Sequence, residues 1–292
     1  MEIEKYKALL CTLELGSLSA AAESLGYTPS GISRMMASLE EESGFPLLIR
    51  GRAGVRPTPD CEKLMPTMRE MVRLGDHYQE IASEICGLET GSVVVGTSYN
   101  FYYQWMAELL ADFEKVYPQI RVTILEGTSS QLNQMVEDHT MDFCIISRRD
   151  GSHRWIPLKK DRLLAWVPKN HPAVKNKFLP LNQLKTEPFI EIYPGQETDN
   201  SRFFREHHIR PNTRHSTTDT FAAYSMVSAG LGIALVNEVF AHMWQGDVEV
   251  LPLDPPQYVD IGIAVPTEER TSPAVKRFIQ FAEEKIWKEK EF

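Results

Sequence analysis

The chain has 292 residues, of which 42% are hydrophobic and 24% are charged. These proportions are ordinary for a globular protein, and the length allows two or three domains with hydrophobic cores. A net charge of −9 excludes a protein covered with basic surface, so any contact with nucleic acid has to be confined to a small region.

The sequence does not indicate secretion, membrane insertion or metal binding. The N-terminus, MEIEKYK, is acidic and polar, unlike a secretory signal, and apolar runs such as LLAWV are too short to cross a bilayer. We therefore expect a cytoplasmic protein with no membrane partner. Four scattered cysteines, without a CxxC pair or a histidine at metal spacing, argue against a metal site or a disulfide framework. A redox role for one of them stays open.

Three helices are predicted at the start of the chain. A helix over residues 2–14 carries apolar side chains every three or four positions. Two more helices lie within Ser17–Glu42, separated by Gly26, which suits the left-handed residue that ends a helix. Thr28 caps the second of them, and Pro29 follows at the first helical position, where its missing N–H is not needed.

This second helix of the pair has a face suited to DNA. Small residues and one long cation share its outer side, namely Thr28, Ser30, Gly31, Ser33 and Arg34. A helix that enters the major groove needs hydrogen-bond donors without bulk. We therefore predict a helix-turn-helix that reads base edges, with an ordinary helical hairpin as the alternative for this motif taken alone.

A short basic hairpin follows the helices. Strands at residues 45–49 and 55–56 flank a turn bounded by glycines, and the surrounding stretch carries Arg50, Arg52 and Arg56 but no acid. We expect these arginines to face the phosphate backbone or the minor groove beside the recognition helix. The hairpin would be the wing of a winged helix-turn-helix.

From Leu9 through Pro66 the chain resembles the N-terminal domain of the LysR-type transcriptional regulators. The matching residues are Gly16-Ser17, Ala20-Ala21-Ala22, Thr28 to Arg34, Leu39-Glu40, Gly44, Pro46-Leu47-Leu48 and Arg50. Pro29 departs from the family, which usually has a groove-reaching glutamine there, so more of the readout would fall on Ser30, Ser33 and Arg34. The resemblance implies a winged helix-turn-helix domain over residues 1–58.

A long helix is predicted from Thr58 to about residue 88. Apolar or small side chains recur along it at alternating spacings of three and four, at Cys61, Leu64, Met68, Met71, Gly75, Tyr78, Ala82 and Ile85. This pattern is typical of a coiled-coil seam, and the alternative is a helix packed on its own domain. The resemblance implies that residues 59–90 form a linker helix that pairs two subunits, with the dimer seam at Leu64, Met68, Met71, Tyr78 and Ile85.

The remaining residues, 91–292, alternate between strands and helices. Buried apolar runs at residues 92–98, 121–127 and 141–147 are joined by helices, which predicts an α/β domain with a parallel sheet. Further strands are expected at residues 163–168, 189–193, 230–236 and 260–266, and helices at 200–207, 219–230 and 272–290. This part resembles the family's effector domain, a two-lobed fold like that of periplasmic solute-binding proteins. The resemblance implies lobe I at 91–161 and 267–292, lobe II at 162–266, and a ligand cleft between them.

Polar residues follow three of these strands, where the ligand of an open α/β sheet lies. They are Thr97, Ser98, Tyr99, Asn100, Thr128, Ser129, Ser147 and Arg148, and we expect Tyr193 and Thr218 of lobe II to face the same gap. Hydroxyls beside helix N-termini suit a carboxylate or phosphate, and Arg148 with Arg149 favours an anionic effector. Each of these residues alone is also explained as a helix cap.

The sequence as a whole predicts a sequence-specific DNA-binding transcriptional regulator controlled by a small, anionic effector. A solute receptor of the transport type would leave residues 1–90 without a role. An enzyme would need a nucleophile or a paired acid and base, and no GxSxG, HExxH or phosphate-binding glycine loop is present. We therefore expect no catalytic residue and no cofactor. The expected partners are promoter or operator DNA, the effector, a second copy in a dimer or tetramer, and RNA polymerase.

Overall fold

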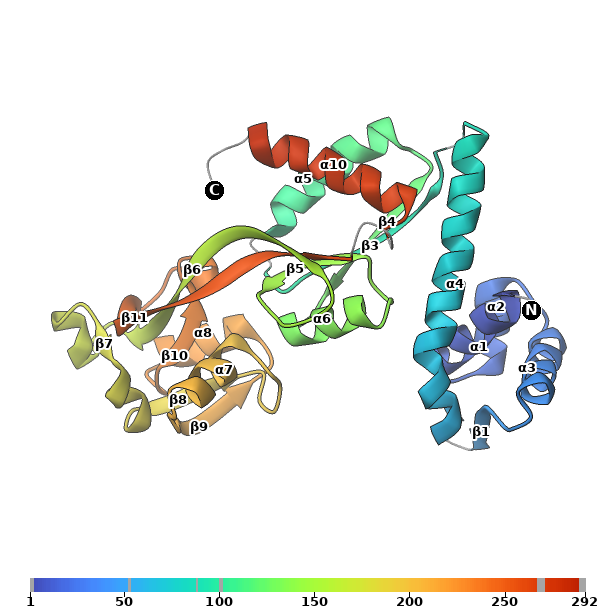
Figure 1. Cartoon of the computed structure of the whole chain (residues 1–292). Coiled ribbons are helices and arrows are strands. Elements are labelled where there is room, and N and C mark those ends of the chain that lie inside the picture. Colours follow the sequence, from blue (N-terminus) through green and yellow to red (C-terminus); the bar gives the residue numbers. More distant parts are fainter. Residues whose placement is uncertain (1–2, 52–53, 88, 100–101, 267–270, 289–292) are drawn as a thin grey trace. The chain divides into compact units, whose positions relative to one another are not determined.

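The computed structural model describes residues 3–51, 54–87, 89–99, 102–266 and 271–288. This part of the chain forms two compact units, one built on the residues up to Gly91 and the other on most of the remainder. Both units combine helices with strands (Figure 1). None of the described helices is both long enough and apolar enough to cross a membrane.

Three helices form the body of the first unit: α1 (Ile3–Leu15), α2 (Leu18–Leu25) and α3 (Pro29–Ser43). The caps follow from the sequence, because Ser17 Oγ accepts the N–H of Ala20 and Thr28 Oγ1 accepts the N–H of Gly31. Gly26 follows α2 with a left-handed φ of 70°. The helices enclose one small core, made of Ala8, Leu9, Ala22, Ile32, Met36, Leu39, Leu47, Leu48, Cys61 and Met68.

The wing consists of the antiparallel strands β1 (Leu48–Gly51) and β2 (Gly54–Pro57). Two sets of hydrogen bonds fasten it to the helices. Val55 donates its backbone N–H to the carbonyl oxygen of Gly16 at 2.8 Å. The carboxylate of Glu40 in α3 accepts the backbone N–H groups of Leu47 and Leu48. The wing therefore keeps a fixed position beside α3.

Helix α4 (Pro59–Ile85) carries two apolar faces instead of one seam. Cys61 and Met68 are buried in the core of the first unit, and a Cβ on Gly75 would lie 2.6 Å from Ile3 of α1. Met68, which was predicted for the dimer seam, packs inside its own domain, so little of its side chain is left for a second copy. A second face, which we call the α4 stripe, exposes Leu64, Leu74, Tyr78, Ile81 and Ile85.

One mixed sheet runs through the second unit in the order β10-β6-β11-β5-β3-β4. Its strands are β3 (Gly91–Thr97), β4 (Ile120–Glu126), β5 (Phe143–Ser147), β6 (Arg154–Pro168), β10 (Ala234–Asn237) and β11 (Val248–Val265), with β7 (Leu179–Pro180) beside β11. Strands β3 and β5 are parallel, whereas β11 is antiparallel to both β5 and β6. The predicted parallel pairing is confirmed for β3 and β5, and antiparallel neighbours are added to the sheet because the chain returns to lobe I through β11.

The helices divide between the two lobes. Lobe I contains α5 (Tyr103–Val116), α6 (Ser129–Glu137) and α10 (Pro273–Lys288); lobe II contains α7 (Asp199–Glu206), α8 (Thr220–Ser228), α9 (Glu238–Ala241) and the parallel pair β8 (Pro188–Ile192) and β9 (Asn212–Thr217). Two short 3₁₀ helices, Pro172–Lys175 and Leu181–Lys185, complete lobe II.

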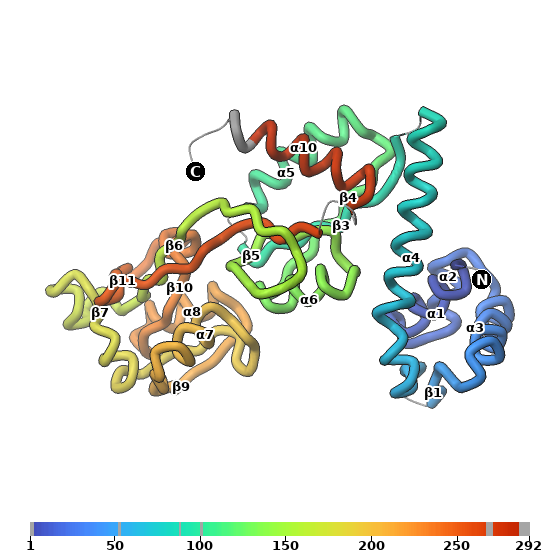
Figure 2. Tube along the Cα trace, viewed as in Figure 1, coloured from blue at the N-terminus to red at the C-terminus, as the bar shows by residue number. Residues whose placement is uncertain are grey.

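The lobes are joined by two long strands that lie side by side, β6 and β11 (Figures 1 and 2). Their register runs from Arg154 opposite Val265 at one end to Pro168 opposite Val248 at the other. The sequence predicted only the apolar end of each strand. The other parts are rich in charged residues or prolines, which hides their strand character.

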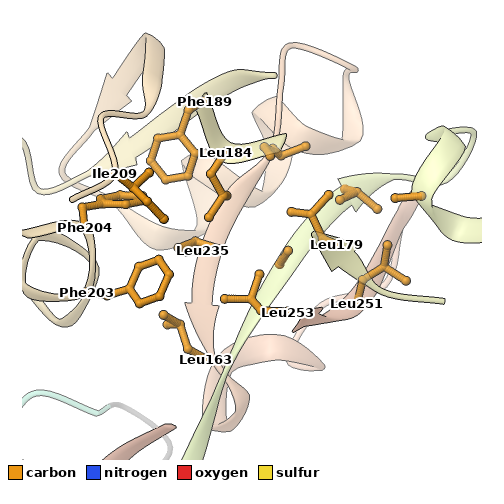
Figure 3. Close-up of a cluster of buried hydrophobic side chains, with 14 residues drawn as sticks. Leu163, Leu179, Leu184, Phe189, Phe203, Phe204, Ile209, Leu235, Leu251 and Leu253 are labelled. Atoms are coloured by element: carbon orange, nitrogen blue, oxygen red, sulfur yellow. The ribbon is translucent and has the colours of Figure 1, made fainter. Parts of the chain in front are cut away.

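A hydrophobic cluster in lobe II holds α7 in place. Figure 3 shows Phe203 and Phe204 of α7 among leucines from β6, β10 and β11. Asn200 adds a hydrogen bond of 3.0 Å from its Nδ2 to the carbonyl oxygen of Leu235. Residues in the first turn of α7 are therefore rigidly positioned at the edge of lobe II.

Candidate functional site

The outer face of α3 carries the residues predicted to read DNA. Thr28 is occupied as the cap, since its Oγ1 accepts from Gly31 and lies 3.2 Å from Ser30 Oγ. Ser30 is exposed, and Gly31 and Ser33 are half-buried. Arg34 is exposed one turn into the helix and is the long cation of this face. The geometry leaves Arg34 with the greatest reach toward a base edge.

The arginines of the wing do not share one face. Arg50 pairs with Val55 and Arg56 pairs with Ile49 across the hairpin. Since paired residues lie on the same side of a ribbon and neighbours on opposite sides, Arg50 and Arg56 project from opposite faces. Both side chains are exposed. If the edge of the wing entered a DNA groove, Arg50 and Arg56 would therefore contact its two opposite walls. Arg52 lies outside the described residues.

A cavity of about 520 Å³ lies between the two lobes of the second unit. It is lined from lobe I by residues at the ends of β3, β4 and β5, and from lobe II by the starts of α7 and α8. Of the residues predicted for the cleft, six line this cavity: Ser98, Tyr99, Thr128, Ser129, Tyr193 and Thr218. The volume is in the range of pockets that enclose small organic molecules.

The other predicted residues lie elsewhere. Thr97 is fully buried and bonds to the backbone of Tyr99. Ser147 is buried behind Ser129, with their hydroxyl oxygens 3.1 Å apart. Arg148 is exposed and does not line the cavity, whereas its neighbour Arg149 does. Asn100 lies outside the described residues.

The polar groups of lobe I converge on a carboxylate of lobe II, that of Asp199. Its oxygens accept from Tyr99 Oη at 3.1 Å, from Arg149 Nη2 at 3.1 Å, from Asn237 Nδ2 at 3.4 Å, and from Ser147 Oγ. The side chains of Arg149 and Asp199 are 7% and 10% exposed. This buried ion pair joins the lobes. Asp199 was not predicted, because no local pattern marks a carboxylate that bonds to the opposite lobe.

Tyr99 contributes a proton donor to this cluster. Burial and the adjacent Asp199 carboxylate raise the pKa of Tyr99 well above its ordinary value. Its hydroxyl therefore stays protonated and donates to Asp199 across the physiological range.

The start of α6, where an anion was expected to bind, is internally bonded. Thr128 Oγ1 accepts the N–H of Gln131, and Gln131 Oε1 accepts the N–H of Thr128 at 3.0 Å. The hydroxyls of Ser98 and Ser129 lie 2.9 Å apart. These groups satisfy one another instead of pointing unpaired into the cavity.

The charged residues of the lining are mostly acidic. Glu126, Asp199 and Asp219 are carboxylates, and Arg149 is the one cation among the described lining residues. Arg149 is already paired with Asp199. The charge of the lining therefore gives no support to the anionic effector expected from the sequence.

Comparison with known proteins covers nearly the whole chain. Residues 3–62 match the family profile of the bacterial regulatory helix-turn-helix proteins of the lysR family, and residues 87–287 match that of the LysR substrate binding domain. The HTH-type transcriptional regulator YvbU of Bacillus subtilis (strain 168) is 26% identical over 287 residues, covering 97% of this chain and 98% of that protein. The relatives of this kind are regulators, not transport receptors.

Two solved structures share the fold. A full-length OxyR variant from Pseudomonas aeruginosa superposes with a TM-score of 0.74 at 19% identity, covering 98% of this chain and 94% of that one. Full-length CbnR complexed with its target DNA superposes with a TM-score of 0.61 at 20% identity, covering 97% of this chain and 99% of that one. At these identities the likeness supports the arrangement of the elements and nothing finer.

Proposed function

Because the chain belongs to the LysR family of bacterial transcriptional regulators, we propose that its α3 reads a promoter or operator sequence and that a small molecule in the interlobe cavity sets this activity. The observation that carries the first part is the exposed outer face of α3 beside a basic wing that is hydrogen-bonded to it. The second part is supported by a cavity of about 520 Å³ between the lobes.

We assign DNA binding to residues 1–58, the linking of subunits to residues 59–90, and effector binding to residues 91–292. Within the last part, lobe I comprises 91–161 and 267–292, and lobe II comprises 162–266. We place the protein in the cytoplasm, where bacterial DNA lies.

Self-association is proposed through the α4 stripe. Its members recur at spacings of three and four toward the end of α4, and Tyr78 and Ile85 are 68% and 82% exposed. Large apolar side chains at such exposure and spacing are typical of a helix that pairs with a second copy. A dimer places two copies of α3 on successive turns of DNA, roughly 10 base pairs apart. Pairing of dimers into tetramers, and a contact with RNA polymerase, stay predictions of the resemblance.

DNA reading is tested with sites recovered by in-vitro selection and with random duplexes of equal length. We expect Arg34→Ala to weaken binding to the selected site by roughly 1–3 kcal/mol and to change binding to random DNA much less. Arg56→Ala serves as the contrast, because loss of a phosphate contact weakens binding to every sequence and lowers the salt slope by about one. Fluorescence anisotropy at several salt concentrations measures both.

The outcomes separate the roles. An equal loss on both DNAs removes Arg34 from base reading, and an unchanged slope removes Arg56 from the phosphate backbone. A wild-type protein that binds selected and random DNA alike contradicts the proposed function itself.

A further inference from the structure

We propose that the small molecule bound in the interlobe cavity carries a cationic nitrogen, an ammonium or guanidinium group, that lies between the carboxylates of Glu126 and Asp219. This inference rests on the proposed function, since it names the chemistry of the ligand at the same site. It reverses the charge expected from the two adjacent arginines of the sequence.

The first step is that the guanidinium of Arg149 is already neutralised. It donates to Asp199 at 3.1 Å, to Ser147 Oγ at 2.6 Å and to Ser130 Oγ at 2.9 Å. At 7% exposure, a second anion could reach it only by displacing Asp199, which would leave that carboxylate buried without its cation. Leaving a buried carboxylate without its cation is strongly unfavourable.

Nearby arginines do not replace it. Arg205 is paired with Glu197 at 2.6 Å, Arg202 donates to the carbonyl oxygen of Arg148 at 2.8 Å, and neither lines the cavity.

Two lining carboxylates are left for a ligand. These are Glu126, at the end of β4, and Asp219, the N-cap of α8. Among the described residues, neither forms an ion pair within 4.0 Å. Glu126 is hydrogen-bonded to Tyr103, a neutral group. Asp219 accepts the N–H of Ala222 at 2.6 Å. Neither carboxylate is therefore paired with a cation among the described residues.

Tyr193 links these two carboxylates. All three residues line the cavity, and burial together with the charges of Glu126 and Asp219 raises the pKa of Tyr193. Tyr193 also has a left-handed φ of 58°, which is rare for a bulky residue and is found at sites where a side chain must point in a set direction. An aromatic ring in the lining can attract a cation through its face.

The test uses the full-length protein and two matched panels of small probes. The first contains primary amines, α,ω-diamines such as 1,4-diaminobutane, and alkylguanidines; the second contains carboxylates of equal length, such as succinate. Thermal denaturation finds binders, and calorimetric titration gives their Kd. We expect binders in the cationic panel only, with Glu126→Gln and Asp219→Asn each weakening binding about tenfold or more.

These two variants keep the local hydrogen bonds. A glutamine oxygen still accepts from Tyr103, and an asparagine still caps α8. Glu114→Gln, on the exposed side of α5 away from the cavity, removes the same charge and is the matched control, for which we expect an unchanged Kd.

The results decide each idea separately. A panel in which no cation binds, or in which binding is unaffected by both cavity variants, overturns the cationic ligand. Carboxylates that bind and alter affinity for the selected operator also overturn it, while the proposed function stands. A cation that binds as expected to a protein without DNA specificity would support the ligand and contradict the proposed function.

Discussion

At the residue scale, the carboxylate of Glu40 connects α3 to the wing by accepting the N–H of Leu47 at 2.8 Å and of Leu48 at 3.1 Å. We expect Glu40→Ala to destabilise this region by about 2 kcal/mol, because two backbone donors lose a charged acceptor. Hydrogen exchange at the amides of Leu47 and Leu48 should become faster in the full-length protein. The exposed neighbour Glu41 is the control, and an equal effect of Glu41→Ala would contradict the assignment.

Asp161 in β6 is expected to make the stability of the fold depend on pH. Its side chain is fully buried, and burial raises the pKa of its carboxyl although Lys159 lies 3.3 Å away. Because the folded pKa is above the unfolded one, the folded state binds more protons, and stability falls as pH rises from the ordinary Asp range through the raised pKa. Asp161→Asn avoids the buried charge and still accepts from the backbone N–H of Val239.

We therefore expect the melting temperature of Asp161→Asn to exceed that of the wild type near neutral pH and to approach it in acid. Thermal scans across pH measure the difference between the two proteins. The exposed Asp260 provides the control Asp260→Asn. A difference that grows as pH is lowered would contradict the sign.

The adjacent arginines show the limit of prediction at this scale. Composition cannot separate Arg148 from Arg149, but strand alternation after the buried Ser147 places Arg149 inward and Arg148 outward. The role of Asp199 could not be predicted, because its partners in lobe I lie 50 or more positions earlier in the chain.

At the element scale, α4 has one face buried in the core of the first unit and another, the α4 stripe, that we propose pairs with a second copy. Tyr78→Glu puts a charge on the α4 stripe, where the side chain is 68% exposed, and should shift the protein toward monomers without unfolding it. Light scattering with circular dichroism measures both properties. Gln79→Glu, one residue away and exposed, is the control. A variant that stays as associated as the control would remove the stripe from the interface.

The sequence pattern predicted this helix, but it did not separate the face buried in the first unit from the exposed α4 stripe. Cys61, Met68 and Gly75 are spaced by sevens and so are Leu64, Met71, Tyr78 and Ile85, so one alternating pattern describes both sets. The small residue Gly75 was the useful signal, since it marks the close approach of α1. Parts of β6 and β11 were not predicted for a different reason. Charged residues on a half-exposed strand remove the apolar pattern by which a strand is predicted from sequence.

At the scale of the whole molecule, the second unit depends on the ion pair between its lobes. We expect Arg149→Met to destabilise it by about 3–5 kcal/mol, because Asp199 is then buried without a cation. Asp199→Asn introduced into the same chain should recover part of this loss. Chemical denaturation of the two single variants and the double variant gives the coupling energy, and strictly additive effects would show that the pair does not act as a unit.

The α/β class of the second unit followed from the order of its strands and helices, because local patterns of burial reveal that order, whereas its two lobes were implied by the family resemblance. The charge of the cavity did not follow from that order, because it results from residues of both lobes meeting in space.

The continuity of β6 and β11 through both lobes limits how the second unit can change shape. A connection made of loops turns freely about a few backbone bonds, but two hydrogen-bonded strands resist bending along their whole length. Their ladder is irregular between Pro252 and Gln257 and again between Ile261 and Gly262, and we expect any bending to concentrate at these two places. We therefore expect a ligand in the cavity to change the angle between the lobes only over a narrow range.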